Sequence, residues 1–164
     1  TVTAITTPTA TPTATPTPTA TATPCDDSFE PNTFPVGKSL NGQCTHSHCT
    51  DDGYELDVAA TINSNSDNDF YVWDVTDQPN DNFQIIAQLK DVPKGVDLDL
   101  YLYRRNGDVF EEVDASTNDG SANETVRYDG SNIDGANSGQ YGLEVRRVSG
   151  TSCNKYTLRI QDPN

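Results

Sequence analysis

Apolar side chains recur at every second position over most of the chain after residue 54, and this alternation limits what the chain can fold into. Its clearest instance is residues 96–103, in which Val or Leu alternates with Asp or Tyr. A period of two places the aliphatic residues on one face of an extended strand and the polar residues on the other. No window shows a sustained helical period. The alternating segments are residues 54–62, 71–75, 83–89, 96–103, 126–128, 141–145 and 156–160.

Asn-Gly, Asp-Gly and Ser-Gly pairs, which favour turns, lie between these segments. Short alternating strands separated by turns are typical of antiparallel sandwiches, which bury one face of each sheet. We therefore predict an all-β fold, an antiparallel jelly-roll-like β-sandwich that occupies residues 25–164. A domain of this length is large enough to bury a hydrophobic core.

Residues 1–24 have a different composition and are predicted to form an extended tail outside the sandwich. Every odd position from Thr7 to Thr23 is Thr, and Pro or Ala stands between them. The tail has no charged or aromatic residue and cannot bury a core of its own. In a polyproline II helix the Thr hydroxyls would point all round the axis. In an extended strand every Thr would share one face, and Pro would leave only one edge able to pair.

The tail suggests two roles, which are compatible with each other. Thr beside Pro and Ala is the composition of O-glycosylated stalks. The predicted glycosylation sites are Thr7, Thr9, Thr11, Thr13, Thr15, Thr17, Thr19, Thr21 and Thr23. Val2, Ala4 and Ile5 are apolar residues at the very start, where a strand added to the sheet of a neighbouring copy would need them. The alternative is a solvated linker.

The chain is strongly acidic, with a formal net charge of −15, and all its charged residues lie in residues 25–164. This charge would repel nucleic acid and suits Ca²⁺, which prefers carboxylate and carbonyl oxygens. No apolar run approaches the roughly 20 residues of a membrane span. The chain begins with Thr1 rather than Met, so we expect that a signal peptide has been removed and that the protein is secreted.

Four cysteines in an acidic chain with a Thr/Pro tail favour an extracellular protein with two disulfides. Four cysteines allow three pairings. We favour Cys44–Cys49, which closes a short loop, together with Cys25–Cys153, which would tie the start of the domain to its last hairpin.

His46 and His48 lie between Cys44 and Cys49, and two Cys with two His are the ligand set of structural zinc. All four side chains fall within six residues, however, which is too tight for easy tetrahedral coordination. In an oxidising compartment the two thiols would pair first, so we expect a disulfide loop here.

Two acidic segments could supply oxygen ligands to a cation. One contains Asp27, Glu30 and Asn32, and the other contains Asp67 and Asp69. Neither follows the EF-hand pattern, and Asp and Asn are also common in solvated turns. The residue types alone leave both interpretations open.

Five motifs occur in an order that resembles the bacterial pre-peptidase C-terminal domain family, which is related to the collagen-binding domains of clostridial collagenases. The resemblance extends from about residue 27 to residue 160. The motifs are Glu30-Pro31-Asn32, Asp67-x-Asp69-Phe70-Tyr71, residues 96–103, Ser138-Gly139-Gln140-Tyr141 and Tyr156-Thr157-Leu158.

The resemblance implies a secreted, non-catalytic, jelly-roll-like sandwich appended to exported enzymes. It also implies a Ca²⁺ site, with Glu30, Asn32, Asp67 and Asp69 as ligands and Asp27 as a further candidate. The chain departs from the collagenase branch at Ser28, where that branch has a second acidic residue. The insertion that holds Cys44 and Cys49 is also absent from the common pattern.

Catalysis is not expected. The only two histidines lie in the small cysteine loop, so a Ser–His–Asp triad would need one of them to reach across the domain. Tyr101 and Tyr103 lie on the polar face of their strand and could form a flat surface for a sugar or a protein strand. Exposed Tyr is also ordinary on the outside of a sheet.

Two functions fit these observations. The first is an extracellular structural subunit that pairs with other copies of itself through the tail and builds a fibril or a surface assembly. The second is an accessory module of a larger secreted hydrolase, in which the tail is a flexible linker and the sandwich binds polysaccharide or extracellular protein. An ordered tail would favour the first and a mobile tail the second.

Overall fold

The computed structural model describes residues 25, 27–41, 55–77, 83–130 and 135–161, and within them every regular element is a strand. None of these residues belongs to a helix, so none belongs to a helix long and apolar enough to cross a membrane. The strands are β1 (Lys38–Ser39), β2 (Glu55–Ile62), β3 (Asp69–Val75), β4 (Gln84–Lys90), β5 (Asp97–Asn106), β6 (Val109–Ser116), β7 (Glu124–Asp129), β8 (Gly139–Ser149) and β9 (Ser152–Gln161).

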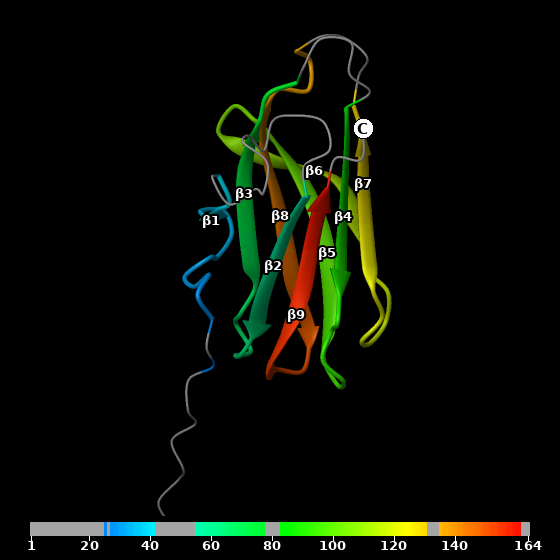
Figure 1. Cartoon of the computed structure of the whole chain (residues 1–164). Helices are drawn as coiled ribbons and strands as arrows, with labels where there is room; N and C mark the ends of the chain where they lie inside the picture. Colours follow the sequence, from blue (N-terminus) through cyan, green and yellow to red (C-terminus); the bar gives the residue numbers. More distant parts are fainter. Residues whose placement is uncertain (1–24, 26, 42–54, 78–82, 131–134, 162–164) are drawn as a thin grey trace, which may run out of the picture.

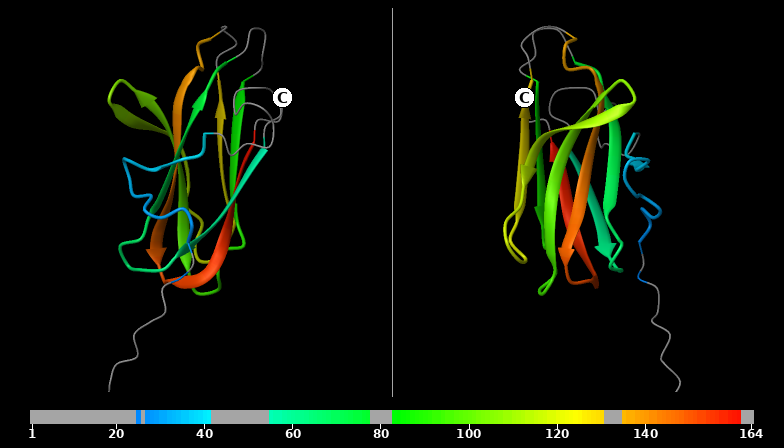
Figure 2. Two further views of the ribbon diagram at one scale, coloured as in Figure 1. Left: turned by 60° about the vertical axis from the view of Figure 1, so that its left-hand side comes forward. Right: turned by 180° about the vertical axis from the view of Figure 1, so that it is seen from behind.

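These strands form two sheets that pack face to face (Figures 1 and 2). One sheet has five strands in the order β1-β3-β8-β5-β6, and the other has four in the order β2-β9-β4-β7. Most consecutive strands lie in different sheets, so the chain passes repeatedly from one layer to the other. The predicted all-β sandwich is confirmed. The pairings are antiparallel except that of the two-residue strand β1, which pairs parallel with β3 through Lys38–Tyr71 and Ser39–Val72.

The core lies between the sheets and is built from the alternation in the sequence. In β4 and in the first half of β5, every second residue is buried and its neighbours are half-exposed. Aromatic residues fill the wider parts of the core, where Trp73 stacks on Tyr141 with ring centroids 6.1 Å apart. Burying such side chains supplies most of the driving force for folding.

A second, smaller hydrophobic cluster covers the outer face of the five-stranded sheet. It consists of the buried side chains of Phe70, Val72 and Tyr103, against which Tyr101 and Phe110 pack. The N-terminal segment, residues 27–41, runs along the outside of β3 (Figures 1 and 2).

Phe34 from this segment contacts Tyr103, with ring centroids 5.4 Å apart. Tyr103 is only 6% exposed as a result, and its hydroxyl donates to Glu144. Tyr101 is half-buried under the guanidinium of Arg146, which lies 3.9 Å from the ring centroid. Of the two tyrosines predicted to form a flat ligand face, Tyr103 is therefore covered, whereas Tyr101 keeps part of its surface exposed.

Close packing in this cluster depends on Gly142 in β8. A Cβ atom at this position would lie 2.5 Å from Cζ of Phe70. Real Cβ atoms do not approach other carbons so closely, so the aromatic ring occupies the space that a side chain would need.

Candidate metal site

The N-terminal segment is fixed to the sandwich at both of its ends. Near its start, Asp27 Oδ2 accepts hydrogen bonds from the backbone N–H (2.6 Å) and the hydroxyl (3.2 Å) of Thr61 at the end of β2. Farther along, the N–H of Phe70 donates to the carbonyl of Asn32, and the N–H of Leu40 donates to the carbonyl of Val72. The residues between these anchors are thereby held against the start of β3.

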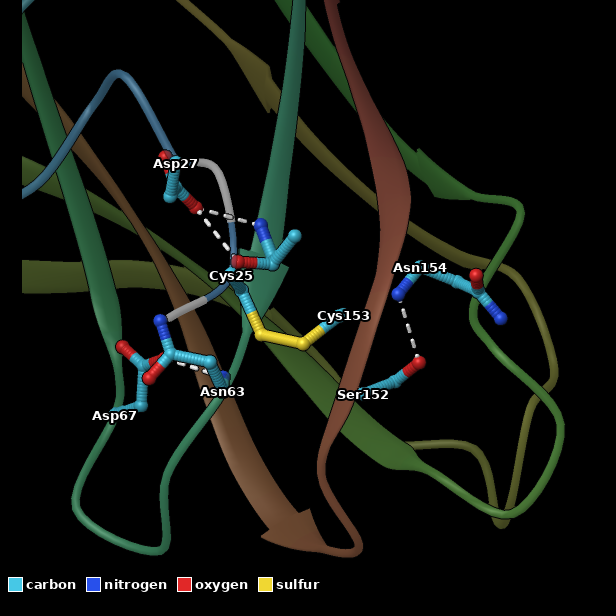
Figure 3. The surroundings of a disulfide bond; sticks show 8 residues. Cys25, Asp27, Asn63, Asp67, Ser152, Cys153 and Asn154 are labelled. Carbon is cyan, nitrogen blue, oxygen red and sulfur yellow. Dashed lines mark hydrogen bonds between the residues drawn. A yellow bond between two sulfur atoms is a disulfide. The ribbon is translucent and has the colours of Figure 1, made fainter. Parts of the chain in front are cut away.

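A disulfide fixes the residue that follows the tail. Cys25 is bonded to Cys153 near the start of β9, with their Cα atoms 5.1 Å apart, and Figure 3 draws Asp27 and Asp67 around this bond. This is one of the two pairings that the sequence favours. The other pair, Cys44 and Cys49, lies outside the described residues, as do the tail residues Val2, Ala4 and Ile5 and the Thr residues predicted to be glycosylated.

Three carboxylates from two segments come together beside this anchor. One oxygen each from Glu30, Asp67 and Asp69 lies within 4.8 Å of the other two. Glu30 is exposed, Asp67 is 8% exposed and Asp69 is fully buried at the first position of β3. Asp67 is held by its own loop, because its Oδ2 accepts a hydrogen bond of 2.6 Å from the N–H of Asn63.

Asp69 has only part of the hydrogen bonding that a buried carboxylate requires. One of its oxygens accepts a hydrogen bond from the hydroxyl of Tyr156, which in turn lies 2.8 Å from the hydroxyl of Tyr71. The other, Asp69 Oδ1, is buried without a hydrogen-bond partner, and so is Nδ2 of Asn32. The Asn32 amide lies close enough to lower the pKa of Asp69, although the two groups do not form a well-aligned hydrogen bond.

Burial and like charge both make ionisation of this cluster costly. Burial, followed by the charge of Asp67, raises the pKa of Asp69 to about 8, against the opposing hydrogen bond from Tyr156. The pKa of Glu30 is also raised, first by burial and then by Asp67. A cation between these groups would remove the repulsion, because it would supply the missing opposite charge and ligate the free oxygen.

The residues present fit an oxygen-ligated cation. The structure brings together Glu30, Asp67 and Asp69 from the predicted set and places the side chain of Asn32 beside Asp69. Asp27 lies outside the cluster of three, and both its oxygens accept hydrogen bonds, from Thr61 and from the N–H of Phe29. Carboxylate and amide oxygens suit Ca²⁺ better than they suit softer metals.

Sequence reasoning missed the two tyrosines behind the site. Tyr156 is 87 residues from Asp69 in the chain, and its place in an alternating strand indicated only a core residue. No local pattern could have connected it to the acidic segment.

Several solved structures resemble this chain, and one of them is a domain of a collagenase. No protein-family model matches the chain, and the curated proteins yielded no match either. The chain resembles the pre-peptidase C-terminal domain of a collagenase from Bacillus anthracis, with 12% identity and a TM-score of 0.41. The alignment covers 65% of this chain and 86% of that one. The matched domain is of the family that the sequence motifs resemble.

Proposed function

We propose that this chain is a non-catalytic, extracellular structural module. In this proposal a Ca²⁺ ion stabilises the β-sandwich, and the Thr/Pro tail joins one copy to the next in a fibril or a surface assembly. The observation that supports the calcium site best is the buried Asp69, whose Oδ1 has no hydrogen-bond partner and which lies beside two further carboxylates.

The ion would be held by Glu30, Asp67 and Asp69, and by the side-chain oxygen of Asn32 once its amide is turned toward the site. These ligands come from the N-terminal segment, from the loop before β3 and from the first residue of β3. An ion that binds both segments only in the folded state would add its binding free energy to the stability of the fold. Its role is therefore structural: it would secure residues 27–32 against the sandwich.

Thermal unfolding with and without calcium tests this role. We expect excess EGTA to lower the Tm of the full chain and Ca²⁺ to restore it, with Mg²⁺ less effective because it demands smaller, more regular coordination. Asp67→Asn combined with Asp69→Asn should abolish the response. Asp119→Asn, which alters an exposed carboxylate elsewhere, is the control and should respond like the wild type. A Tm unaffected by EGTA in the wild type would refute the calcium site.

The proposal for the tail is supported by its covalent anchor. Cys25, the first residue after the tail, is bonded to Cys153 near the start of β9, so the tail begins at a fixed point on the sandwich. Disulfides of this kind persist in oxidising compartments, which agrees with an extracellular location. The Thr residues would carry O-linked glycans and shield the extended segment between copies.

Electron microscopy of the native protein, beside a version that begins at Cys25, tests assembly. We expect filaments with the tail and monomers without it, and mass spectrometry should find glycans on Thr residues between positions 7 and 23. Monomers in both preparations would contradict assembly. They would instead favour an accessory domain that binds carbohydrate or protein and uses the tail as a linker.

A further inference from the structure

An apolar groove lies on the outer face of the five-stranded sheet. Its volume is 420 Å³. The N-terminal segment contributes one wall, and the other is the hairpin formed by β5 and β6. The lining residues are Phe34, Pro35, Arg105, Asp108, Val109 and Phe110.

The aromatic residues of this groove are firmly supported from below. The buried ring of Phe70 lies under both walls, with its centroid 4.8 Å from that of Phe34 and 5.1 Å from that of Phe110. The turn that presents Phe34 is closed by hydrogen bonds from the N–H groups of Val36 and Gly37 to the carbonyl of Thr33. A binding surface preorganised in this way loses little entropy when it takes up a ligand.

The groove and its rim expose several large apolar side chains. Phe34 is 41% exposed, Val109 is 58% exposed and Val36, next to the groove, is 84% exposed. Contiguous exposed apolar residues rimmed by polar ones mark interaction sites in soluble proteins.

We propose that this groove receives the Thr/Pro tail of a second copy of the chain. The inference rests on the proposed assembly and names the surface that would accept the tail. In an extended strand, the even positions from Pro8 to Pro24 are all Pro or Ala and share one face, while the odd positions are all Thr. The Pro/Ala face would pack on the rings of Phe34 and Phe110, and the Thr face would point to solvent, where glycans can be carried.

Charge also favours the tail as the occupant. Every charged residue lies in residues 25–164, whose net charge is −15, so two folded domains repel each other when they approach. The tail carries no side-chain charge and can enter the groove of an acidic neighbour without that repulsion. Its 24 residues would span roughly 70–80 Å when extended, which is long enough to connect two domains.

The position of the groove relative to the anchor of the tail favours a second copy. Asp97 at the start of β5 pairs with Ser149, beside the turn that leads to Cys153, whereas Arg104 near the end of β5 pairs with Tyr141. The hairpin that lines the groove therefore lies at the opposite end of the sandwich from the disulfide. A tail that begins at one end of the sandwich and a receiving groove that extends to the hairpin at the other end would form a head-to-tail contact. Such a contact does not close and builds an open chain.

Photocrosslinking within filaments of the full chain tests the contact directly. A benzophenone amino acid is placed at Val109, and filaments are formed from a mixture of this protein and an isotopically heavy wild type. We expect crosslinks from the light chain to residues 1–24 of the heavy chain. Crosslinks to the tail of the same chain only, or to no part of the tail, would overturn the proposal.

A pair of matched variants separates this proposal from the broader one. Val109→Glu places a charge in the groove, and Val148→Glu places the same charge at a valine of similar exposure, 51%, near the other end of the sandwich. Both variants should keep the wild-type Tm, and only Val109→Glu should lose filaments, by tenfold or more. Equal filament yields from both variants would overturn the proposal that the groove binds the tail, but would not contradict the proposed assembly. A wild type that forms no filaments would refute the assembly itself.

Discussion

Replacing Asp69 with Asn should remove most of the pH dependence that this site gives to the folding stability of the calcium-free protein. In the folded chain, burial raises the pKa of Asp69 from its usual value of 3.8 to about 8. Between these values the unfolded chain ionises Asp69 while the folded chain keeps it protonated, so folding takes up a proton. Stability is therefore highest at low pH with respect to this group and falls as the pH rises toward 8.

The size of the effect follows from the same two values. Each pH unit in this window costs about 1.4 kcal/mol, so going from pH 5 to pH 8 should lower the free energy of unfolding by about 3–4 kcal/mol. This is a large part of the 5–15 kcal/mol that stabilises a typical domain. An amide at position 69 cannot ionise, and the contribution should disappear.

Urea unfolding in EGTA at pH 5 and pH 8 measures this directly, with Asp119→Asn as the control for a lost negative charge. The quantity to compare is the difference in unfolding free energy between wild type and Asp69→Asn at each pH. We expect the free energy of unfolding of the variant to increase relative to that of the wild type as the pH rises. Saturating Ca²⁺ should abolish the loss of stability in the wild type, because the ion holds the carboxylate in its charged form. A difference that stays constant from pH 5 to pH 8 would refute the reasoning.

Three further predictions concern stability and use urea unfolding as the assay. Replacing Cys25 and Cys153 with Ser opens a loop of 128 residues and should lower the free energy of unfolding by about 4–5 kcal/mol; no change would show that the bond is not formed. Gly142→Ala should cost about 1–3 kcal/mol through overpacking, and Phe70→Leu in the same chain should recover part of it; an unaltered Ala variant would contradict the packing. Glu124→Gln should cost about 1–3 kcal/mol, because this buried carboxylate accepts hydrogen bonds that an amide satisfies only in part; a neutral substitution would contradict this.

The sequence predicts those strands that have one face in the core. Apolar residues recur at every second position in residues 83–89 and 96–103 because one side of β4 and β5 packs against the opposite sheet. Strand β6 gave no such signal, since it lies at the edge of its sheet and most of its residues, such as Val109 and Glu112, are exposed. An edge strand without a buried face is not required to alternate.

The candidate site could be predicted only as far as its ligand types. The two acidic segments were evident, and their resemblance to a known family joined them. Their environment was not evident, because it depends on contacts between residues distant in the sequence. Tyr156 supports Asp69 across 87 residues, and the N-terminal segment that covers Tyr103 belongs to another part of the chain. Alternation assigns a side chain to a face of a sheet but cannot say what covers that face.

The position of the disulfide determines where mechanical load would enter the domain. A pulling force applied to the chain before Cys25 reaches the disulfide first and passes through Cys153 into β9. This strand lies between β2 and β4, so the force is shared by two ladders of backbone hydrogen bonds. Residues 27–41 are bypassed, and the short β1 and the carboxylate cluster bear little of the tension. A calcium site next to the point of attachment could thus stay intact in a fibre under strain.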